Sequence, residues 1–300
     1  MAMNRASFAK MLEPGLNTLF GLEYDQYPAE YAAVFASNTS QKAFEEDVLL
    51  SGFGSAPTKS EGSAISYDDA GQQWTARYQH ETVALAFSIT EEAEEDGQYG
   101  SIASRYTKAL ARSMASTKEI KAANVLNNAT TANGGDGTTL LSTSHPTQNG
   151  NQSNTLATAA DLSEVSLEAI LIQIADMKDD RGLRIAAQGT QLVIPTAYTF
   201  VAERLLESQL RTGTADNDIN AIRNMGAIPE GYAVNHYLTD TNAFYILTDI
   251  PNGMKHFERT SLETSMDGDF DTGNVRYKAR ERYSFGVSDP LGIYGSPGSS

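Results

Sequence analysis

An unusually long β pattern between residues 74 and 89 constrains the fold of this 300-residue chain more than any other feature. Apolar and polar residues alternate from Trp74 to Tyr78 and, after a short break, from Val83 to Ile89. This is the period of a strand with one buried face. A continuous strand of this length spans roughly 55 Å, well beyond the usual strand of about 5–6 residues. We therefore predict that it leaves the compact body as one arm of a hairpin.

A protruding hairpin needs a surface to lie on, because an isolated two-stranded ribbon is only marginally stable in water. Residues 46–90 supply both arms: Val48 to Leu50 begin the outgoing strand, and glycines, serines and Lys59 form the connection. In a homo-oligomer that surface is another copy of the chain. The pattern therefore favours a protein that assembles with itself.

The strongest helical pattern covers residues 101–127. Apolar residues recur at helical spacing without an intervening Pro or Gly, namely Ile102, Tyr106, Leu110, Met114, Ile120, Ala123 and Leu126. A helix of this length extends roughly 40 Å. Its bases, which include Arg105 and Arg112, could contact DNA or pair with acidic residues of this or a neighbouring copy. We favour the pairing.

The remaining patterns complete a predicted α+β fold. Residues 1–45 predict a short helix broken near Pro14 and then an irregular arm, and residues 128–162 a polar surface loop. A helix over about 163–180, capped by Asp161 or Ser163, precedes a buried strand at 191–194 that enters a third helix through Pro195. Residues 212–262 alternate short strands and loops, 274–287 predict a closing strand, and 295–300 a disordered tail.

Composition excludes several classes of protein. The chain has no Cys, so it has no disulfide, no thiol nucleophile and no Cys-ligated metal. The net charge of −16 makes it a poor candidate for gripping nucleic acid by its phosphates. No apolar run reaches the length of a membrane span, and the N-terminus lacks the apolar core of a signal peptide.

Candidate catalytic and metal-binding residues do not form a recognisable site. His80, His145, His236 and His256 are far apart in sequence and match no zinc-binding spacing. The acidic run at 90–97 fits a helix start better than a cation site. The segment 267–274 begins like a calcium loop, but Thr272 and Lys278 stand where Gly and Glu are needed, so we interpret it as an acidic turn. We predict no enzyme activity, cofactor or metal.

Five segments, in this order, resemble those of the major capsid proteins of tailed bacteriophages with the Hong Kong 97-type fold. They are the Ala84–Tyr99 strand with its acidic continuation, the helix end Glu119–Asn127, the Leu141–Pro146 loop, the strand–Pro–helix unit from Leu192 to Leu206, and the closing strand from Val275 to Arg282. The acidic element and the loop are most similar to the Mu-like major head subunits. The resemblance covers the chain from about residue 55 onward.

The resemblance implies a division of the chain into named parts. Residues 1–45 would be the N-terminal arm, 46–90 the extended E-loop, and 91–162 with 263–292 the peripheral P-domain carrying the spine helix 101–127. Residues 163–262 would be the axial A-domain and 293–300 a flexible tail. The guessed contacts between copies are Lys59, Trp74, Tyr78, Arg105, Arg112, Arg280, Glu281 and Arg282.

The implied function is that of a shell subunit. Hexamers and pentamers would enclose double-stranded phage DNA, which the subunit would contact without sequence preference, and the shell would be built in the host cytoplasm as part of the virion. The implied partners are other copies of the chain, portal and scaffolding proteins and a decoration protein, with no membrane contact. Because no helical scaffolding segment precedes the arm, we expect a separate scaffold. Covalent crosslinking through Lys59 is not expected, since no matching partner is apparent.

The alternatives are an encapsulin-type compartment with an enzyme cargo, of the same fold, and a metal-dependent enzyme using Asp267, Asp269 and Asp271.

Overall fold

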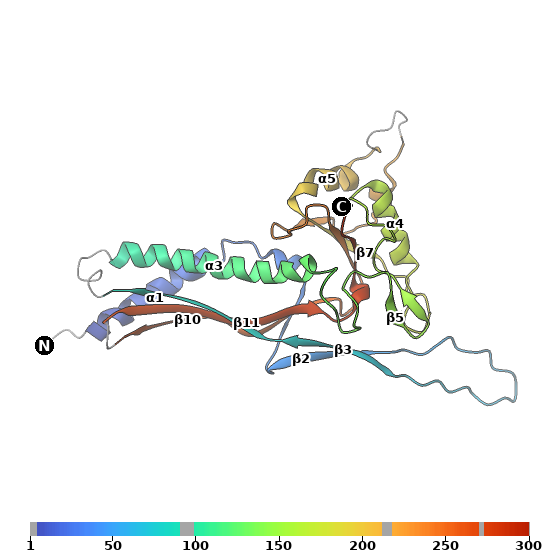
Figure 1. Cartoon of the computed structure of the whole chain (residues 1–300), viewed down its shortest axis with the longest axis horizontal. Coiled ribbons are helices and arrows are strands. Elements are labelled where there is room, and N and C mark those ends of the chain that lie inside the picture. Colours follow the sequence, from blue (N-terminus) through green and yellow to red (C-terminus); the bar gives the residue numbers. More distant parts are fainter. Residues whose placement is uncertain (1–4, 91–98, 212–217, 270–272, 300) are drawn as a thin grey trace.

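A computed structural model describes residues 5–90, 99–211, 218–269 and 273–299. The chain forms an elongated region of long strands and two helices, a second region of shorter elements, and a hairpin that projects away from both (Figure 1). Its sheets have the strand orders β1-β10-β11-β4, β12-β9-β7-β8, β2-β3 and β5-β6. No described helix combines the length and the apolar character needed to cross a membrane.

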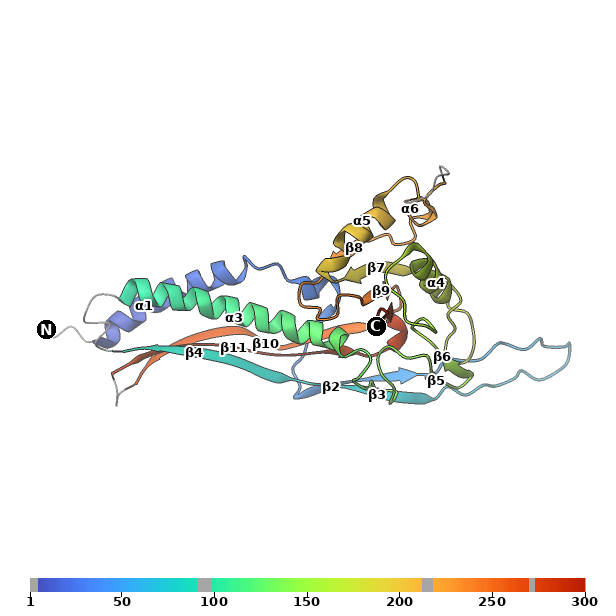
Figure 2. The same ribbon diagram turned by 45° about the horizontal axis from the view of Figure 1, so that its top comes forward.

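The elongated region is a four-stranded sheet with two helices on one of its faces (Figure 2). Its strands are β1 (Ala36–Thr39), β10 (Met254–Gly268), β11 (Val275–Val287) and β4 (Glu81–Ile89), and its helices are α1 (Arg5–Tyr24) and α3 (Tyr99–Asn127). Leu16 and Phe20 of α1 meet Leu110 and Met114 of α3 over Tyr277 of β11 in one buried cluster. Among the described residues, no helix lies on the other face of the sheet (Figure 2).

Helix α3 confirms the predicted 101–127 helix. Leu110, Met114, Ala123 and Leu126 are buried as expected, but Tyr106 and Ile120 are about half exposed. The buried apolar face of α3 is therefore narrower than the predicted one, because only part of that face packs against the sheet. On the other side, Lys108 pairs with Glu23 of α1 in the same chain at 3.6 Å, so this base already has an intrachain acidic partner.

Helix α1 corrects the prediction of a break near Pro14. The helix continues through Pro14, although proline removes one backbone hydrogen bond. The hydroxyl of Thr18 donates to the Pro14 carbonyl at 2.8 Å. Burial of Leu16 and Phe20 against α3 provides the tertiary packing that sustains the helix.

The long β pattern is two strands that belong to different sheets. β3 (Gln72–Gln79) pairs with β2 (Phe44–Leu50), whereas β4 pairs with β11. The break falls at His80, whose buried ring contacts the hydroxyls of Ser40 and Ser284, each at 3.0 Å. The prediction that the whole pattern leaves the body is therefore wrong for residues 81–89, which lie in the long sheet.

The second region is a four-stranded sheet flanked by short helices. Its strands are β7 (Gly189–Ile194), β8 (Tyr232–Val234), β9 (Phe244–Thr248) and β12 (Ile293–Ser296), and its helices are α4 (Glu164–Ala175), α5 (Thr199–Glu207) and α6 (Ala221–Met225). The short 3-10 helices are η1 (Glu30–Ala33), η2 (Thr196–Tyr198) and η3 (Pro290–Gly292), and the hairpin β5 (His145–Thr147) and β6 (Gly150–Gln152) lies beside α4. Ser163 caps α4 as predicted, and Pro195 precedes η2 and α5 as predicted.

Two further predicted limits do not coincide with the ends of the observed elements. The boundary at 262/263 falls inside β10, which runs unbroken from Met254 to Gly268 and pairs with β11 across a bulge. The tail predicted to be flexible from residue 293 contains β12, whose four residues are all buried against β9. The Gly-Ser-Pro composition suggested disorder, but tertiary pairing orders it. The acidic run at 91–96 lies outside the described residues.

Candidate functional site at the protruding hairpin and the long sheet

The protruding hairpin consists of β2, β3 and the connecting residues 51–71. The ladder ends where Leu50 pairs with Gln72, and the bond from the Ser51 amide to the Gly71 carbonyl, 2.8 Å long, closes it. Beyond it the two legs of the connection run side by side far from the body (Figure 1). Phe53, Ile65 and Tyr67 in these legs are 60%, 67% and 93% exposed. The hairpin thus presents apolar side chains without an intrachain surface to cover them.

Asp68 is the main contact between the outer part of the hairpin and the rest of the chain. Its carboxylate accepts from the Gly54 amide of the other leg at 2.8 Å and from the Arg181 guanidinium at 2.5 Å. Arg181 also donates to the Gln148 side chain, in the turn between β5 and β6, at 2.6 Å. These bonds lower the pKa of Asp68, chiefly through the Gly54 amide. Through Arg181, this contact holds the protruding hairpin beside the turn between β5 and β6.

The base of the hairpin rests on two glycines. A Cβ atom at Gly135 would lie 2.9 Å from Trp74, and one at Gly286 would lie 2.7 Å from Tyr78. Tyr78 is also held by the Ser288 hydroxyl at 2.5 Å and by an edge contact with Phe257. The hairpin therefore leaves the sheet at a fixed place, because both aromatic rings sit directly on backbone.

Adding a methyl group at either glycine should disturb this base. We expect Gly135→Ala and Gly286→Ala each to lower the free energy of unfolding by about 1–3 kcal/mol, the cost of overpacking. Gly52→Ala, which meets only open space, is the matched control and should change it by less than about 0.5 kcal/mol. Urea unfolding of the unassembled subunit measures all three. Equal stability of the three variants would contradict the role of the two glycines.

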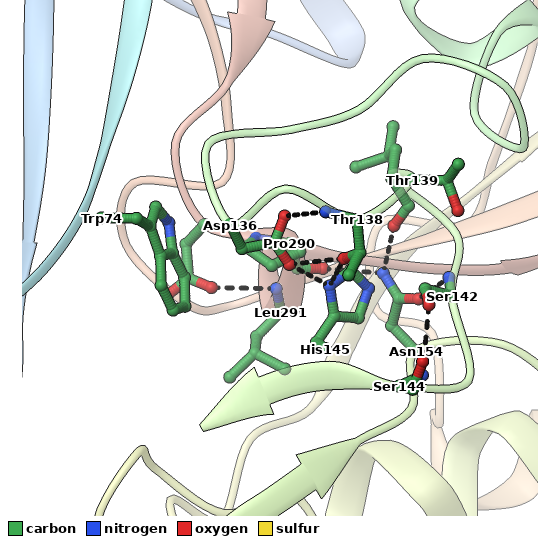
Figure 3. A network of polar contacts seen from close by, with 12 residues as sticks. Trp74, Asp136, Thr138, Thr139, Ser142, Ser144, His145, Asn154, Pro290 and Leu291 are labelled. Atoms are coloured by element: carbon green, nitrogen blue, oxygen red, sulfur yellow. Dashed lines mark hydrogen bonds and ion pairs between the residues drawn. The ribbon is translucent and has the colours of Figure 1, made fainter. Parts of the chain in front are cut away.

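A buried polar network joins the 128–162 segment to the chain beside Trp74 (Figure 3). Asp136 accepts from the His145 ring and from the Thr138 hydroxyl, each at 2.6 Å. These bonds lower the pKa of Asp136 against the opposing effect of burial. The completely buried Asn154 amide donates to the carbonyls of Leu140, Pro290 and Ile293. The network has a structural role, since the side chains of Asp136, His145 and Asn154 are almost fully enclosed.

The open face of the long sheet carries a row of basic side chains, which we call the basic row. Arg276, Lys278 and Arg280 alternate along β11 and are exposed, and Arg282 continues the row half-buried. Between them Tyr277, Ala279, Glu281 and Tyr283 point to the helices and are buried. The register partners of the row on β4 are the small residues Ser88, Ala86, Ala84 and Thr82. Small neighbours leave the long basic side chains uncovered.

Beneath this face lies a buried ion pair. The Lys118 ammonium of α3 is 3.4 Å from Glu281, and both side chains are almost fully enclosed. Lys118 also lies over the rings of Tyr31 and Tyr283 at 5.2 and 5.1 Å. Burial raises the pKa of Glu281 despite its partner. An enclosed pair of this kind holds α3 on β11 in one register.

A cavity of about 490 Å³ opens where η1, α3 and the loop at His236 meet. Glu119 of α3 accepts from the Tyr31 amide at 3.1 Å, while Glu30 contacts the His236 ring at 2.6 Å. Burial raises the pKa of Glu119 to about 7, and the Tyr31 amide opposes this shift only in part. The two carboxylates thus connect η1 to both regions of the fold.

The raised pKa of Glu119 predicts a pH effect on stability. Its folded value of about 7 lies above the ordinary 4.5, so its stabilising contribution is complete below about pH 4.5 and is lost as the pH rises through about 7. We expect Glu119→Gln, which stays neutral, to gain thermal stability over the unmodified chain between pH 5 and pH 8. The exposed Glu230→Gln is the control and should show a constant difference. A flat difference for Glu119→Gln as well would contradict the prediction.

The structure separates the predicted contact residues into two groups. Lys59, Arg105, Arg112 and Arg280 are exposed, and Trp74 and Arg282 are half-buried. Tyr78 and Glu281 are only 3% and 1% exposed within the chain, so they are not surface contacts. Both lie on the inward face of their strands, on the same side as the buried residues that alternate with them. Sequence reasoning missed Asp68, Gly135 and the Asp136–His145 pair, for which no local motif exists.

No group of three or more metal-binding side chains occurs among the described residues. Asp269 instead holds Arg276 in the turn between β10 and β11. The four histidines remain separate, and each one is hydrogen-bonded to side chains of its own surroundings. The geometry therefore offers surfaces for other protein chains and no assembled catalytic centre in the part of the chain that the structure covers.

Comparison with known proteins identifies relatives of this fold. A structure described as Mycobacterium phage Adephagia aligns with a TM-score of 0.54 and 9% identity over 91% of each chain. The capsid of Myoviridae phage XM1 gives 0.53 and 10% identity over 88% of this chain and 90% of that one. A virus-like particle from Pyrococcus furiosus gives 0.51 and 9% identity over 94% and 97%. No curated protein sequence matches the chain.

These likenesses confirm the predicted capsid fold. At such low identity they concern the fold alone, and the family is shown by the sequence itself. The family described as phage capsid protein matches residues 73–296, which include nearly all of β3, the strands β4, β10 and β11 of the long sheet, α3 and the whole of the second region. The match covers well over half of the chain. The chain belongs to the phage capsid protein family and is a structural, non-enzymatic component of the virion shell.

Proposed function

We propose that this chain is a major head subunit that assembles as hexamers and pentamers into a closed icosahedral shell around double-stranded DNA. The hairpin carries the proposal. Its connection, residues 51–71, has no regular secondary structure and exposes Phe53, Ile65 and Tyr67 far from the chain's own core. Such a ribbon is costly in water for a monomer and becomes useful when a neighbouring copy covers it.

The proposal assigns the implied parts to this fold. The hairpin is the E-loop, α1 and η1 form the N-terminal arm, the long sheet with α3 is the P-domain, and the second region is the A-domain. The boundary between the last two lies before β10, since that strand is continuous. Among the predicted contacts, Lys59, Trp74, Arg105, Arg112, Arg280 and Arg282 remain proposed contacts between copies.

The finer classification and the other partners belong to the same proposal. The acidic run at 91–96 and the loop from Leu141 support membership in the Mu-like group. Portal, scaffolding and decoration proteins would bind the assembled shell. DNA would be contacted without sequence preference, because the chain is strongly acidic and its basic side chains are few.

Imaging of the purified chain tests the proposal. Expression of the chain alone, or with a scaffolding protein, should give closed particles in negative-stain micrographs. Rings or monomers under every condition would overturn it.

A shell that packages an enzyme is the second candidate, because the particle from Pyrococcus furiosus shares the fold over 94% of this chain. Analysis of particles purified from producing cells separates the two. Packaged DNA of uniform length supports the head subunit, whereas a stoichiometric protein cargo without DNA supports the compartment.

A further inference from the structure

Two arginines without a partner lie where β10 bulges. Arg259 lies in the bulge between Glu258 and Thr260, and Arg282 of β11 is the register partner of Thr260. Both side chains are half-buried, and among the described residues neither guanidinium makes a hydrogen bond or an ion pair. Buried polar groups are nearly always bonded, so an unbonded charged donor indicates an acceptor that the chain itself does not supply.

The positive charges of both arginines act on His80. Its ring is buried and contacts the hydroxyls of Ser284 and Ser40, each at 3.0 Å. Ser284 follows Arg282 by two residues, so both side chains lie on the open face of the long sheet. Burial lowers the pKa of His80, and the charges of Arg282 and Arg259 lower it further. The ring thus lies within the field of both guanidinium groups, which places the two charges close together.

The carboxylates around this pair of charges are engaged elsewhere. Glu45 acts on the same ring, but its carboxylate is bonded to the Ser40 hydroxyl at 2.8 Å and to Lys42 at 3.0 Å. Glu263 lies opposite Arg280, the preceding member of the basic row. The acids that are adjacent in sequence face the helix side of the sheet; they are Glu81, Glu258 and Glu281. A chain with a net charge of −16 therefore leaves two neighbouring cations without a counter-charge among its described residues.

A small oxyanion supplies what this arrangement lacks. Guanidinium groups bind phosphate and related anions through paired N–H donors, and such bonds between charged groups are the strong ones. We propose that Arg259 and Arg282 together bind one tetrahedral oxyanion of the size of inorganic phosphate, beside His80. Their half-buried position favours a small ion over the backbone of a DNA duplex, since only part of each side chain reaches the surface.

The bound ion would brace the point where the protruding hairpin leaves the long sheet. It would connect the bulge of β10 to β11, next to His80, at which β3 ends and β4 begins. All of these residues belong to one copy, so the site is complete in the unassembled subunit. The inference therefore goes beyond the proposed shell assembly and does not depend on it.

Histidine signals in NMR spectra of the unassembled subunit test the site directly. Phosphate is titrated at pH 7 in sodium chloride of constant total ionic strength, and the His80→Gln variant assigns the His80 signals. We expect saturable shifts of the His80 signals and a rise in the pKa of His80, because a bound anion offsets the charges of the arginines. The signals of His236, which lies beside Glu30, should show no saturable shift.

Charge-neutral variants locate the site. Arg282→Gln and Arg259→Gln should each weaken phosphate binding by about tenfold or more, the contribution of one charge-assisted hydrogen bond. Lys278→Gln removes the same charge from the same face of β11, so it is the matched control and should bind phosphate as the unmodified chain does. Circular dichroism checks that each variant folds. If one arginine variant does not fold, the other carries the same comparison.

Three results would overturn the inference. No saturable shift of the His80 signals would mean that water alone solvates the two arginines. An equal loss of binding in Lys278→Gln would reduce the effect to general screening of the basic row. A response to a short DNA duplex but not to phosphate would assign the two arginines to nucleic acid. Each of these results removes the phosphate site and leaves the proposed shell assembly untouched.

Discussion

A chain that lacks residues 55–70 is expected to fold but to form no closed particles. The deleted residues lie beyond the last hairpin pair and contribute no buried apolar side chain. We therefore expect the free energy of unfolding to change by less than about 0.5 kcal/mol, as for other surface changes. Assembly should fail because the neighbouring copy loses the ribbon that would cover it. Sedimentation and negative-stain microscopy measure the two effects.

A replacement of the same residues by a Gly-Ser tract of equal length is the matched control for reach. This variant should also fail to assemble, since it keeps the span but loses the apolar and acidic side chains of residues 55–70. Normal particles from the deletion would contradict the role given to the hairpin. Normal particles from the Gly-Ser variant alone would show that only the length of the connection matters.

Removal of one partner of the buried Lys118–Glu281 pair should have the largest effect on stability. Lys118→Met leaves an uncompensated carboxylate between α3 and β11, and breaking such a pair typically costs about 3–5 kcal/mol. The loss should be smaller at acid pH. Burial already raises the pKa of Glu281, and without Lys118 the carboxyl accepts a proton more easily still. Urea unfolding of the unassembled subunit at two pH values measures this.

The double variant Lys118→Met with Glu281→Met decides whether the cost comes from the isolated charge. Replacing both partners by apolar groups is often close to neutral, so the double variant should be more stable than Lys118→Met alone. If the double variant is less stable than either single variant, the packing of the two stems matters more than their charges.

Local sequence patterns predicted an element correctly where the interactions that define it are made by residues close together in the chain. Helix α3 and the β7–Pro195–α5 unit were predicted because apolar spacing and proline position act within a few residues. The same applies to the Ser163 cap, which is bonded within its own first turn. The candidate site was predicted in part: the outgoing and returning strands of the hairpin were placed as far as Gln79, and two of the basic side chains of β11, Arg280 and Arg282, were named.

The pairing of strands that are far apart in the sequence decided the features that local patterns did not predict. The alternation from Trp74 to Ile89 gives no sign that His80 divides it between two sheets, because only the partners β2 and β11 distinguish the halves. In the same way, Arg280, Glu281 and Arg282 read as one charged run, although the pleat directs Glu281 inward to Lys118. The first residues of the Gly-Ser-Pro tail, Gly295 and Ser296, belong to the buried strand β12 because they pair with the edge of β9.

What the sequence determined by itself is a set of amphipathic elements and a ribbon too long for one body, since side-chain period and turn residues act locally. What only the tertiary structure decided is which faces and edges are covered. That depends on contacts between residues far apart in the chain, which no local pattern encodes.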